Sequence, residues 1–229
     1  IKVGNTLILS TDSGGIDVGK LVLDVNPATH THEVKNFELK TLYADEWKPD
    51  PVTQKVIDGW NKKLADIVRQ PVGVSPSTLT RAYGESSQLG NLFTDAMLVA
   101  APNAQIALIN SGSLRADINA GPITFGDIVS TFPFKNELTE MDLSGKDLRN
   151  LMEHGASLTN GILQMSKGAE MHYMPQKPVG QRMVSFTING KEIADTETYH
   201  VATTTFLALG GDGFLAFKKG KNVQVRAGN

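Results

Sequence analysis

The sequence predicts an α+β fold, because strand and helix patterns follow one another along the chain. Between residues 21 and 25 the side chains alternate as they do in a strand, and Asn26-Pro27 ends the run. Apolar residues then recur at helical spacing over residues 52–68. The short apolar run of residues 105–109 is typical of a strand that is buried on both faces.

The first 45 residues contain strand patterns only. An extended, partly alternating pattern resumes at His32 and continues to Leu42, so the simplest arrangement is a hairpin with its tip near residues 27–31. Two or three strands cannot form a core of their own. We therefore expect this segment to need a sheet that is supplied from elsewhere.

The clearest helix follows this segment. Asp50-Pro51 places a capping residue before a proline at the first helical position, and Pro71 closes the element. A single amphipathic helix between two strand-rich regions is typical of a connector between domains. Its apolar positions are Val52, Val56, Trp60, Leu64, Ile67 and Val68.

Strands and helices mix in the remainder of the chain. A second helix is expected over residues 89–101. Ser144 and Asp147 form the pattern of a capping box at the start of another helix, which we expect Gly155 to end. An alternating apolar run before Asn189-Gly190 is the strongest hairpin signal in the sequence.

Composition excludes several classes of function. The chain has 229 residues, with 22 Lys and Arg against 24 Asp and Glu and no Cys. A nearly balanced charge argues against nucleic acid as the main partner, and the lack of Cys excludes disulfides, thiolate metal sites and a Cys nucleophile. No apolar run approaches the roughly 18 residues that span a bilayer. Because the chain starts at Ile1 without a signal-peptide pattern, we expect a piece of a longer protein.

Three loops concentrate polar or aromatic groups where a regular element ends. The first, residues 110–115, directly follows the run expected to be a buried strand, and open sheets bind ligands at such ends. Small residues such as Gly112 let a ligand approach the backbone, while Asn110 and Arg115 offer hydrogen bonds to phosphate or hydroxyl oxygens. A tight turn with a surface arginine fits the same pattern.

The second and third loops contain aromatic residues. Residues 206–214 hold Asp212 among three glycines, a few positions after Phe206. A carboxylate held in this way can accept both hydroxyls of a ribose, although a glycine turn in which the aspartate bonds its own backbone fits equally well. In the third loop, one of Phe132 and Phe134 is a candidate stacking platform, whereas packing in the core is the commoner fate of phenylalanine.

The histidines do not predict a metal site. His30 and His32 form a His-x-His pair at the expected hairpin tip, where an exposed turn is the better interpretation. His154 belongs to the polar face of a helix and His200 to a strand, and neither has a catalytic partner by spacing. The sequence also lacks a phosphate-binding loop, a nucleophile elbow and an HExxH motif. The residues therefore indicate a binding part without visible catalytic groups.

Four segments stand in a characteristic order along the chain. They contain Gln88-Leu89-Gly90-Asn91-Leu92, Asn110-Ser111-Gly112-Ser113-Leu114-Arg115, Phe132-Pro133-Phe134-Lys135-Asn136 and Gly210-Gly211-Asp212-Gly213-Phe214. Together they resemble the C-terminal, substrate-binding domain of the 5′-nucleotidase family, over residues 46–229. The resemblance implies a mixed sheet and three parts. It implies that residues 1–45 are the remnant of a metallophosphatase domain, that residues 46–70 form a linker helix, and that residues 71–229 form the substrate-specificity domain.

The resemblance also implies roles for individual residues. Phe134 and Phe206 correspond to the two aromatics that clamp the nucleobase, where stacking is worth about 1–3 kcal/mol per base. Asp212 corresponds to the acceptor of the ribose hydroxyls, and Asn110 and Arg115 to the polar pair beside the nucleotide. An expected second arginine and a loop glycine complete the set: Phe134, Phe206, Asp212, Asn110, Arg115, Arg81 and Gly112.

Family members hydrolyse phosphoesters with two metal ions on an N-terminal domain, whose motifs this sequence lacks. The resemblance therefore implies a divalent pair, such as Zn²⁺, Mn²⁺ or Mg²⁺, in that missing domain, which is the expected partner. The chain alone should be inactive, and it should bind a nucleoside or nucleotide. It also implies a periplasmic or extracellular location and, because the chain stops at Asn229 before the family's final helix, truncation at both ends.

Other functions stay open at this point. One is the C-terminal part of a 2′,3′-cyclic-nucleotide phosphodiesterase/3′-nucleotidase, and another is a non-catalytic nucleoside-binding module. A sulfur-oxidising thiohydrolase relative fits less well, because Asn110, Arg115 and the paired phenylalanines suit a nucleotide.

Overall fold

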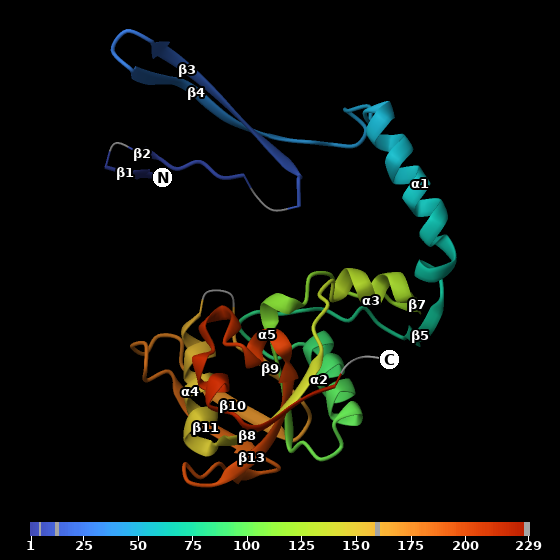
Figure 1. The fold of residues 1–229 in the computed structure, drawn as a ribbon, viewed down its shortest axis with the longest axis vertical. Helices are drawn as coiled ribbons and strands as arrows, with labels where there is room; N and C mark the ends of the chain where they lie inside the picture. Colours follow the sequence, from blue (N-terminus) through green and yellow to red (C-terminus); the bar gives the residue numbers. More distant parts are fainter. Residues whose placement is uncertain (5, 12–13, 159–160, 227–229) are drawn as a thin grey trace. The chain divides into compact units, whose positions relative to one another are not determined.

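The computed structural model describes residues 1–4, 6–11, 14–158 and 161–226. The chain falls into two units, Ile1–Leu64 and Ala65–Asn229. Strands of the first unit pair as two separate antiparallel ribbons (Figure 1). They are β1 (Lys2–Val3) with β2 (Thr6–Leu7), and β3 (Asp17–Asn26) with β4 (Thr31–Thr41).

The turn between β3 and β4 lies where the sequence predicts the hairpin tip. The side-chain Oδ1 of Asn26 accepts hydrogen bonds from the backbone amides of Ala28 (3.0 Å) and Thr29 (3.3 Å), which closes the turn. His30 has a left-handed φ of 53° in this exposed turn, and His32 follows in β4. The expected exposed turn is confirmed.

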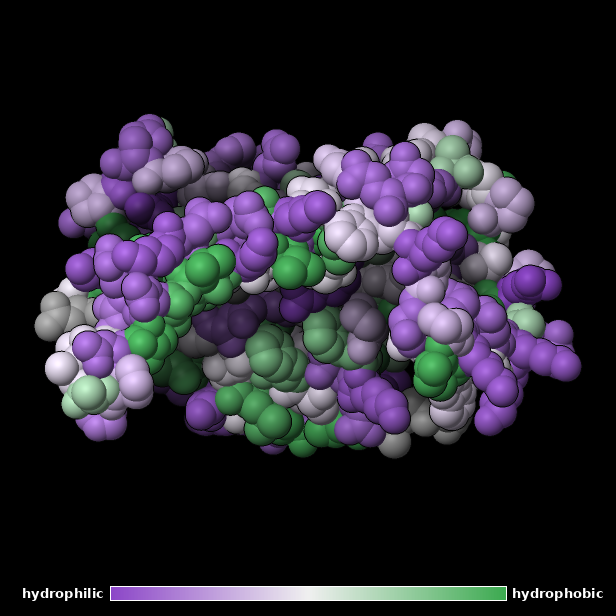
Figure 2. Space-filling model, turned by 90° about the horizontal axis from the view of Figure 1, so that it is seen from above, coloured by the Kyte–Doolittle hydropathy of each residue, from purple (hydrophilic) through white to green (hydrophobic). Residues whose placement is uncertain are grey.

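Helix α1 (Pro51–Val68) begins as predicted. The Asp50 side chain caps it by accepting a hydrogen bond of 2.8 Å from the Thr53 amide, which lowers the pKa of the Asp50 carboxyl. No residue of α1 is buried, and Trp60 is 57% exposed. Exposed apolar side chains appear as green patches among the purple polar ones in Figure 2.

The second unit is built on a five-stranded sheet of order β14-β8-β13-β6-β9. Strands β13 and β6 are parallel, whereas the other neighbouring pairs are antiparallel, so the sheet is mixed as predicted. The strands are β6 (Ile106–Asn110), β8 (Leu138–Ser144), β9 (Leu163–Met165), β13 (Thr198–Thr204) and β14 (Lys221–Arg226).

Strand β6 is buried along its whole length, as its apolar run predicts. Alternate residues serve two different clusters, because successive side chains of a strand point to opposite faces. Ala107 packs with Met97 of helix α2 (Gln88–Ala100), while Ile106 and Leu108 join the main core.

Helix α4 (Gly145–Ser157) supplies much of the main core through Leu148, Leu151 and Met152. The Ser144 hydroxyl caps it by accepting from the Asp147 amide at 3.1 Å, which confirms the predicted start.

The prediction that Gly155 ends α4 is wrong, because the helix continues through Ser157. Gly155 is buried, and a Cβ there would lie 3.2 Å from the backbone nitrogen of Leu163. This glycine therefore lets the chain approach α4 closely at the start of β9, rather than stopping the helix.

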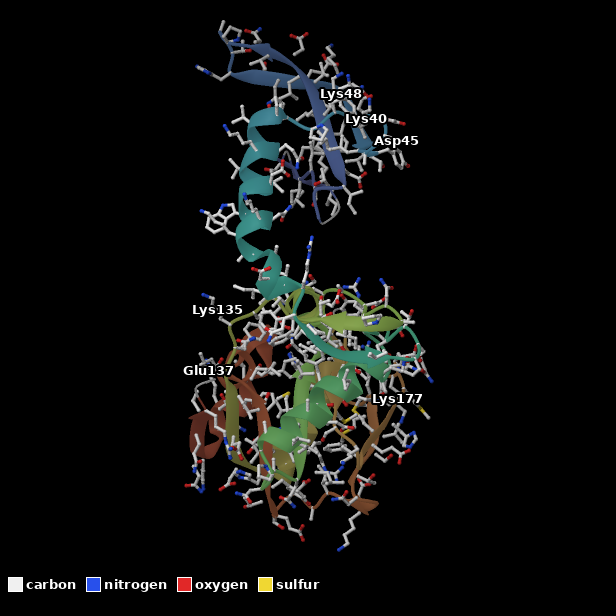
Figure 3. All side chains as sticks on the ribbon, turned by 90° about the vertical axis from the view of Figure 1, so that its right-hand side faces the viewer. Lys40, Asp45, Lys48, Lys135, Glu137 and Lys177 are labelled. Carbon is white, nitrogen blue, oxygen red and sulfur yellow. The ribbon has the colours of Figure 1, made fainter. Side chains whose placement is uncertain are left out.

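Smaller elements complete the unit. In the hairpin that joins β11 to β12, Asn189 and Gly190 have φ of 51° and 75°, as the predicted two-residue turn requires. The segment between α3 and β8 carries Lys135 and Glu137, which lie at the side of the unit (Figure 3). The elements are β5 (Pro71–Ser75), β7 (Gly121–Thr124), α3 (Phe125–Thr131), β10 (Ala169–Tyr173), β11 (Met183–Ile188), β12 (Lys191–Glu192) and α5 (Thr205–Ala208), with 3₁₀ turns at Ser111–Ser113, Gly211–Gly213 and Leu215–Lys219.

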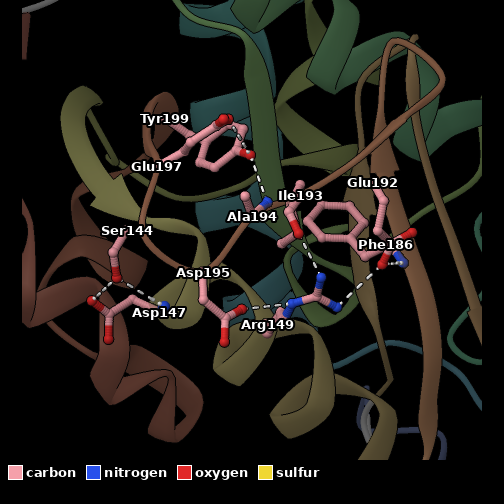
Figure 4. A network of polar contacts seen from close by, with 10 residues as sticks. All are labelled: Ser144, Asp147, Arg149, Phe186, Glu192, Ile193, Ala194, Asp195, Glu197 and Tyr199. Carbon is pink, nitrogen blue, oxygen red and sulfur yellow. Dashed lines mark hydrogen bonds and ion pairs between the residues drawn. The ribbon is translucent and has the colours of Figure 1, made fainter.

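A polar network fastens the segment after β11 to α4 (Figure 4). The Arg149 guanidinium donates to Asp195 at 2.8 Å and to Glu192 at 3.2 Å, and it also donates to the carbonyl of Ile193. The Tyr199 hydroxyl accepts from the Ala194 amide at 2.9 Å. Since the Arg149 bonds link α4 to residues 43 to 46 positions away in the sequence, we assign this network a structural role.

A second network joins three neighbouring strands of the five-stranded sheet, β13, β8 and β14. His200 of β13 bonds Asp142 at 2.6 Å and Glu140 at 3.2 Å, and the guanidinium of Arg226 in β14 donates to Glu140. The hydrogen bond with Asp142 is the largest cause that raises the pKa of His200. The Glu140 side chain is only 2% exposed, and His200 and Arg226 supply the hydrogen-bond partners that its buried carboxyl group needs.

Candidate functional site

Three loops meet at one edge of the five-stranded sheet. Because β6 and β13 are parallel, with Val201 paired to Ile106, their last residues Asn110 and Thr204 reach the same edge. Strand β8 is antiparallel to β13, and its first residue, Leu138, pairs with Thr204. The segment before β8 therefore arrives at this edge too, and the pairing gathers the three loops that the sequence analysis selected.

Asn110 and Asp212 are joined directly across this edge. The Asn110 Nδ2 donates a hydrogen bond of 2.7 Å to Oδ2 of Asp212, and the Ser113 hydroxyl donates to Asn110 Oδ1. Since a carboxylate can only accept, the amide nitrogen must be the atom that faces Asp212. Asn110 is 6% exposed, so a buried amide holds one carboxylate oxygen of a partly exposed aspartate.

The loop that carries Asp212 folds through left-handed conformations. Gly210, Asp212 and Gly213 have φ of 81°, 52° and 79°. For a residue with a side chain this conformation costs about 1–2 kcal/mol, so contacts must hold Asp212 in place. A Cβ on Gly211 would lie 2.5 Å from the ring of Phe206. Glycine at this position therefore allows the Phe206 ring to rest on the loop.

Two aromatic side chains present faces at the site. Phe134 and Phe206 are 40% and 39% exposed. Phe134 is supported at its edge by Phe132, with ring centroids 5.7 Å apart in a T-shaped arrangement, and Phe132 in turn contacts Phe93. The guanidinium of Arg115 lies 5.4 Å from the Phe134 centroid. Phe134 is thus held by neighbours but is not buried in the core.

These groups enclose a cavity of about 570 Å³. Exposed aromatic faces, one carboxylate and one guanidinium suit a ligand that combines a planar ring with hydroxyl or anionic groups. Six of the seven residues selected from the sequence line it. The lining consists of Tyr83, Asn110, Gly112, Ser113, Arg115, Phe134, Asn136, Phe206 and Asp212.

Arg81, the seventh selected residue, is not in this lining. Its guanidinium donates to the carbonyl of Arg115 and, at 3.5 Å, to that of Leu114, and it lies 3.6 Å from Asp117. Arg81 therefore supports the loop that carries Arg115. Tyr83, two residues further on, reaches the cavity instead.

The segment that presents Tyr83 is held by Gln164, which is 1% exposed. The Gln164 amide nitrogen donates to the carbonyl of Glu85 and to the hydroxyl of Ser111, both at 2.9 Å. Its carbonyl oxygen accepts from the Ser87 amide at 2.8 Å. A Cβ on Gly90 would lie 2.2 Å from that oxygen, which accounts for the glycine.

Sequence reasoning missed Tyr83, Ser113 and Asn136. Ser113 and Asn136 lie inside segments that it had selected, so their presence follows once those loops converge. Tyr83 gave no signal of its own, because it reaches the cavity through a segment whose position depends on the distant Gln164.

Among the described residues, no group of three His, Cys, Asp or Glu side chains is arranged to hold a metal ion. The helices of the described ranges include none long and apolar enough to cross a membrane.

The family model described as 5′-nucleotidase, C-terminal domain matches residues 67–219. The chain belongs to this family. The match confirms the resemblance that the four ordered segments indicate. It also identifies the five-stranded sheet and its loop edge as the fold of the 5′-nucleotidase C-terminal domain.

Three similar proteins are each longer than this chain. The crystal structure of a 5′-nucleotidase precursor from Thermus thermophilus matches with a TM-score of 0.79 and 29% identity, over 92% of this chain and 44% of that one. The trifunctional nucleotide phosphoesterase protein YfkN of Bacillus subtilis is 31% identical over 78% of this chain and 13% of its own length. An apyrase of Tabanus yao is 30% identical over 89% of this chain. The chain thus spans less than half of each relative, with 44% of the apyrase covered.

Proposed function

We propose that this chain is the nucleotide-binding part of a 5′-nucleotidase-like phosphoester hydrolase, and that its cavity holds the base and ribose. The observation that carries the proposal is the arrangement of Phe134, Phe206 and Asp212 around one cavity. Aromatic faces and a carboxylate on a glycine loop are complementary to the two halves of a nucleoside.

The base would stack between the two phenylalanines. Stacking on an aromatic side chain is worth about 1–3 kcal/mol per base and tolerates any base, because every base has a π-face. The support of Phe134 by Phe132 keeps its ring in place before the ligand arrives, which lowers the entropic cost of binding.

The ribose hydroxyls would donate to Asp212. Asn110 occupies one carboxylate oxygen at 2.7 Å, and this bond fixes the plane in which the second oxygen can accept. Arg115 is exposed and carries a fixed charge, so it would contact an anionic or polar group of the nucleotide beside the sugar.

Hydrolysis would take place outside this chain. The described residues offer no fitting cluster for a metal ion, and the family resemblance assigns a divalent pair, such as Zn²⁺, Mn²⁺ or Mg²⁺, to an N-terminal domain. Such a pair would supply an activated water and stabilise the developing charge. In this proposal residues 1–45 are the remnant of that domain, 46–70 its linker, and 71–229 the substrate-specificity domain.

Calorimetric titration of the chain with adenosine and AMP, without metal, tests the proposal. We expect both to bind, and we expect Phe134→Ala and Phe206→Ala each to weaken that binding. Retention of full affinity in both variants would show that these rings are not the base clamp. Phosphate release from AMP by the chain with Zn²⁺, Mn²⁺ or Mg²⁺ would contradict a purely binding role.

A second substrate class, the 3′- and cyclic nucleotides, fits the same cavity, because these molecules also carry a base that can stack on Phe134 and Phe206. Titration with 3′-AMP and 2′,3′-cyclic AMP in parallel with AMP separates the classes. A non-catalytic nucleoside-binding module would instead show unchanged turnover when the clamp residues are mutated in the full-length protein. We also propose a periplasmic or extracellular location, which fractionation of cells that make the full-length protein would test.

A further inference from the structure

The conformation of Asp212 needs support beyond its bond to Asn110. Asn110 holds the side chain, whereas the left-handed φ of 52° is a property of the main chain. Glycines at 211 and 213 make the flanking backbone more flexible, so they do not hold the conformation themselves. The N–H of the peptide after Asp212 is held within the loop, because the Gly213 amide donates to the carbonyl of Gly210 at 3.2 Å. A second group that holds the carbonyl side of this peptide would fix its orientation.

His154 of α4 supplies that group. Its Nε2 lies 2.9 Å from the backbone carbonyl oxygen of Asp212. Because a carbonyl oxygen can only accept a hydrogen bond, Nε2 must carry the proton and donate. The bond joins the loop to a helix 58 residues away in the sequence.

The His154 ring is itself held in position. It packs edge-on against Phe214, with centroids 4.7 Å apart and planes at 87°, and Phe214 is 1% exposed. A Cβ on Gly213 would lie 3.0 Å from Nε2 of His154, so this glycine admits the ring against the loop. His154 does not line the cavity that contains Asp212, and therefore acts from behind the loop.

From these contacts we propose that His154 is a positioning residue for ribose recognition. It fixes the main chain of Asp212 while Asn110 fixes the carboxylate, and together they direct the second carboxylate oxygen into the cavity. The inference rests on the proposed function, since it concerns how the nucleoside site discriminates a ribose. Base stacking on Phe134 and Phe206 should not depend on it.

The test compares adenosine with 2′,3′-dideoxyadenosine, which keeps the base but lacks both hydroxyls. In His154→Leu, adenosine affinity should fall about three- to ten-fold, the effect of one lost hydrogen bond, while dideoxyadenosine affinity stays unchanged. His154→Gln keeps an N–H donor at a similar reach and should retain most of the discrimination. His172→Leu, a change at an exposed histidine on β10, is the matched control and should change neither affinity.

Asp212→Ala distinguishes failure of the inference from failure of the proposed function. If the wild-type chain does not prefer adenosine, or if Asp212→Ala leaves that preference intact, Asp212 does not bind ribose and the proposed function is wrong. If Asp212→Ala removes the preference but His154→Leu does not, the inference alone fails. Equal weakening of both ligands by His154→Leu would indicate a merely structural role and would also overturn it.

A measurement without ligand tests the geometry directly. Nitrogen NMR spectra of the free chain should show His154 protonated at Nε2, and the side-chain amide resonances of Asn110 should shift in His154→Leu but remain near their wild-type positions in His154→Gln. Protonation of His154 at Nδ1 alone would overturn the inference, and so would Asn110 side-chain resonances that do not shift in His154→Leu.

Discussion

Replacing Gln164 with leucine should destabilise the second unit and loosen one wall of the cavity. The amide of Gln164 joins the segment of Tyr83 to Ser111, which directly follows Asn110. Leucine has a similar volume but can make none of these bonds. The change therefore isolates the polar contribution of the side chain from its packing.

The magnitude follows from the groups that lose a partner. The Ser87 amide is buried and would lose its 2.8 Å acceptor, which costs about 1–3 kcal/mol. The bonds to Glu85 and Ser111 each contribute about 0.5–1.5 kcal/mol, and part of this is recovered because Glu85 is exposed to water and Ser111 still donates to Ile162. We expect a loss of about 2–4 kcal/mol, a large share of the roughly 5–15 kcal/mol that stabilises a typical domain.

The assay must report on the second unit. Both tryptophans of the chain, Trp47 and Trp60, lie in the first unit, so tryptophan fluorescence would follow the wrong part. Urea unfolding followed by circular dichroism, with hydrogen exchange of β6 amides as a local probe, avoids this. Gln88→Leu, at an exposed glutamine on α2, is the control and should change the free energy of unfolding by less than about 0.5 kcal/mol. A Gln164→Leu chain as stable as this control would refute the reasoning.

Three further results are expected. Phe134→Ala and Phe206→Ala should each weaken adenosine binding by about 1–3 kcal/mol in calorimetry. Because 40% and 39% of these side chains is exposed, thermal unfolding should show a smaller loss of stability than the roughly 3–5 kcal/mol of a fully buried phenylalanine. Gly211→Ala should displace the Phe206 ring, because the new Cβ would lie 2.5 Å from it, and should lower adenosine affinity without unfolding the chain. The control Gly73→Ala, whose Cβ would have no atom within 4 Å, should leave adenosine affinity unchanged. Because the pKa of His200 is raised in the folded state, its protonation should stabilise the fold fully below the unfolded pKa near 6.5, and this stabilisation should be lost as the pH rises through the folded pKa. The difference in the free energy of unfolding between wild type and His200→Gln should therefore shrink as the pH rises. A constant difference would contradict the ion-pair network.

The sequence predicts local elements well where the signal is local. Asp50 caps α1 and Asn189-Gly190 turns a hairpin, because capping and left-handed φ depend on a few neighbouring residues. The prediction at Gly155 is wrong because a glycine near a helix end usually indicates a stop. Here the glycine is needed because the backbone of Leu163 packs closely against it. That contact joins distant segments, and no local pattern can reveal it.

At the candidate site, too, local signals could be predicted from the sequence and contacts between distant segments could not. The loops of Asn110, Phe134 and Asp212 are recognisable because each combines functional groups with turn residues. The parallel pairing of β6 with β13 and the antiparallel pairing of β13 with β8 then bring them together. Arg81 and Tyr83 lie two positions apart, and which of them faces the cavity depends on contacts with Asp117 and Gln164. Tertiary contacts decide this, so sequence reasoning selected Arg81 from this segment, whereas the side chain that lines the cavity is that of Tyr83.

The order of strands in the central sheet also bears on how the protein folds. The Asn110–Asp212 contact joins residues 102 positions apart, and the chain reaches Asp212 through β13, which lies between β6 and β8 in the sheet. Closing such long loops is slow, so the cavity should be among the last features to appear during refolding. A nucleoside that binds only the completed cavity would then raise the melting temperature in proportion to the logarithm of its concentration, and would act as a probe of fully folded chains.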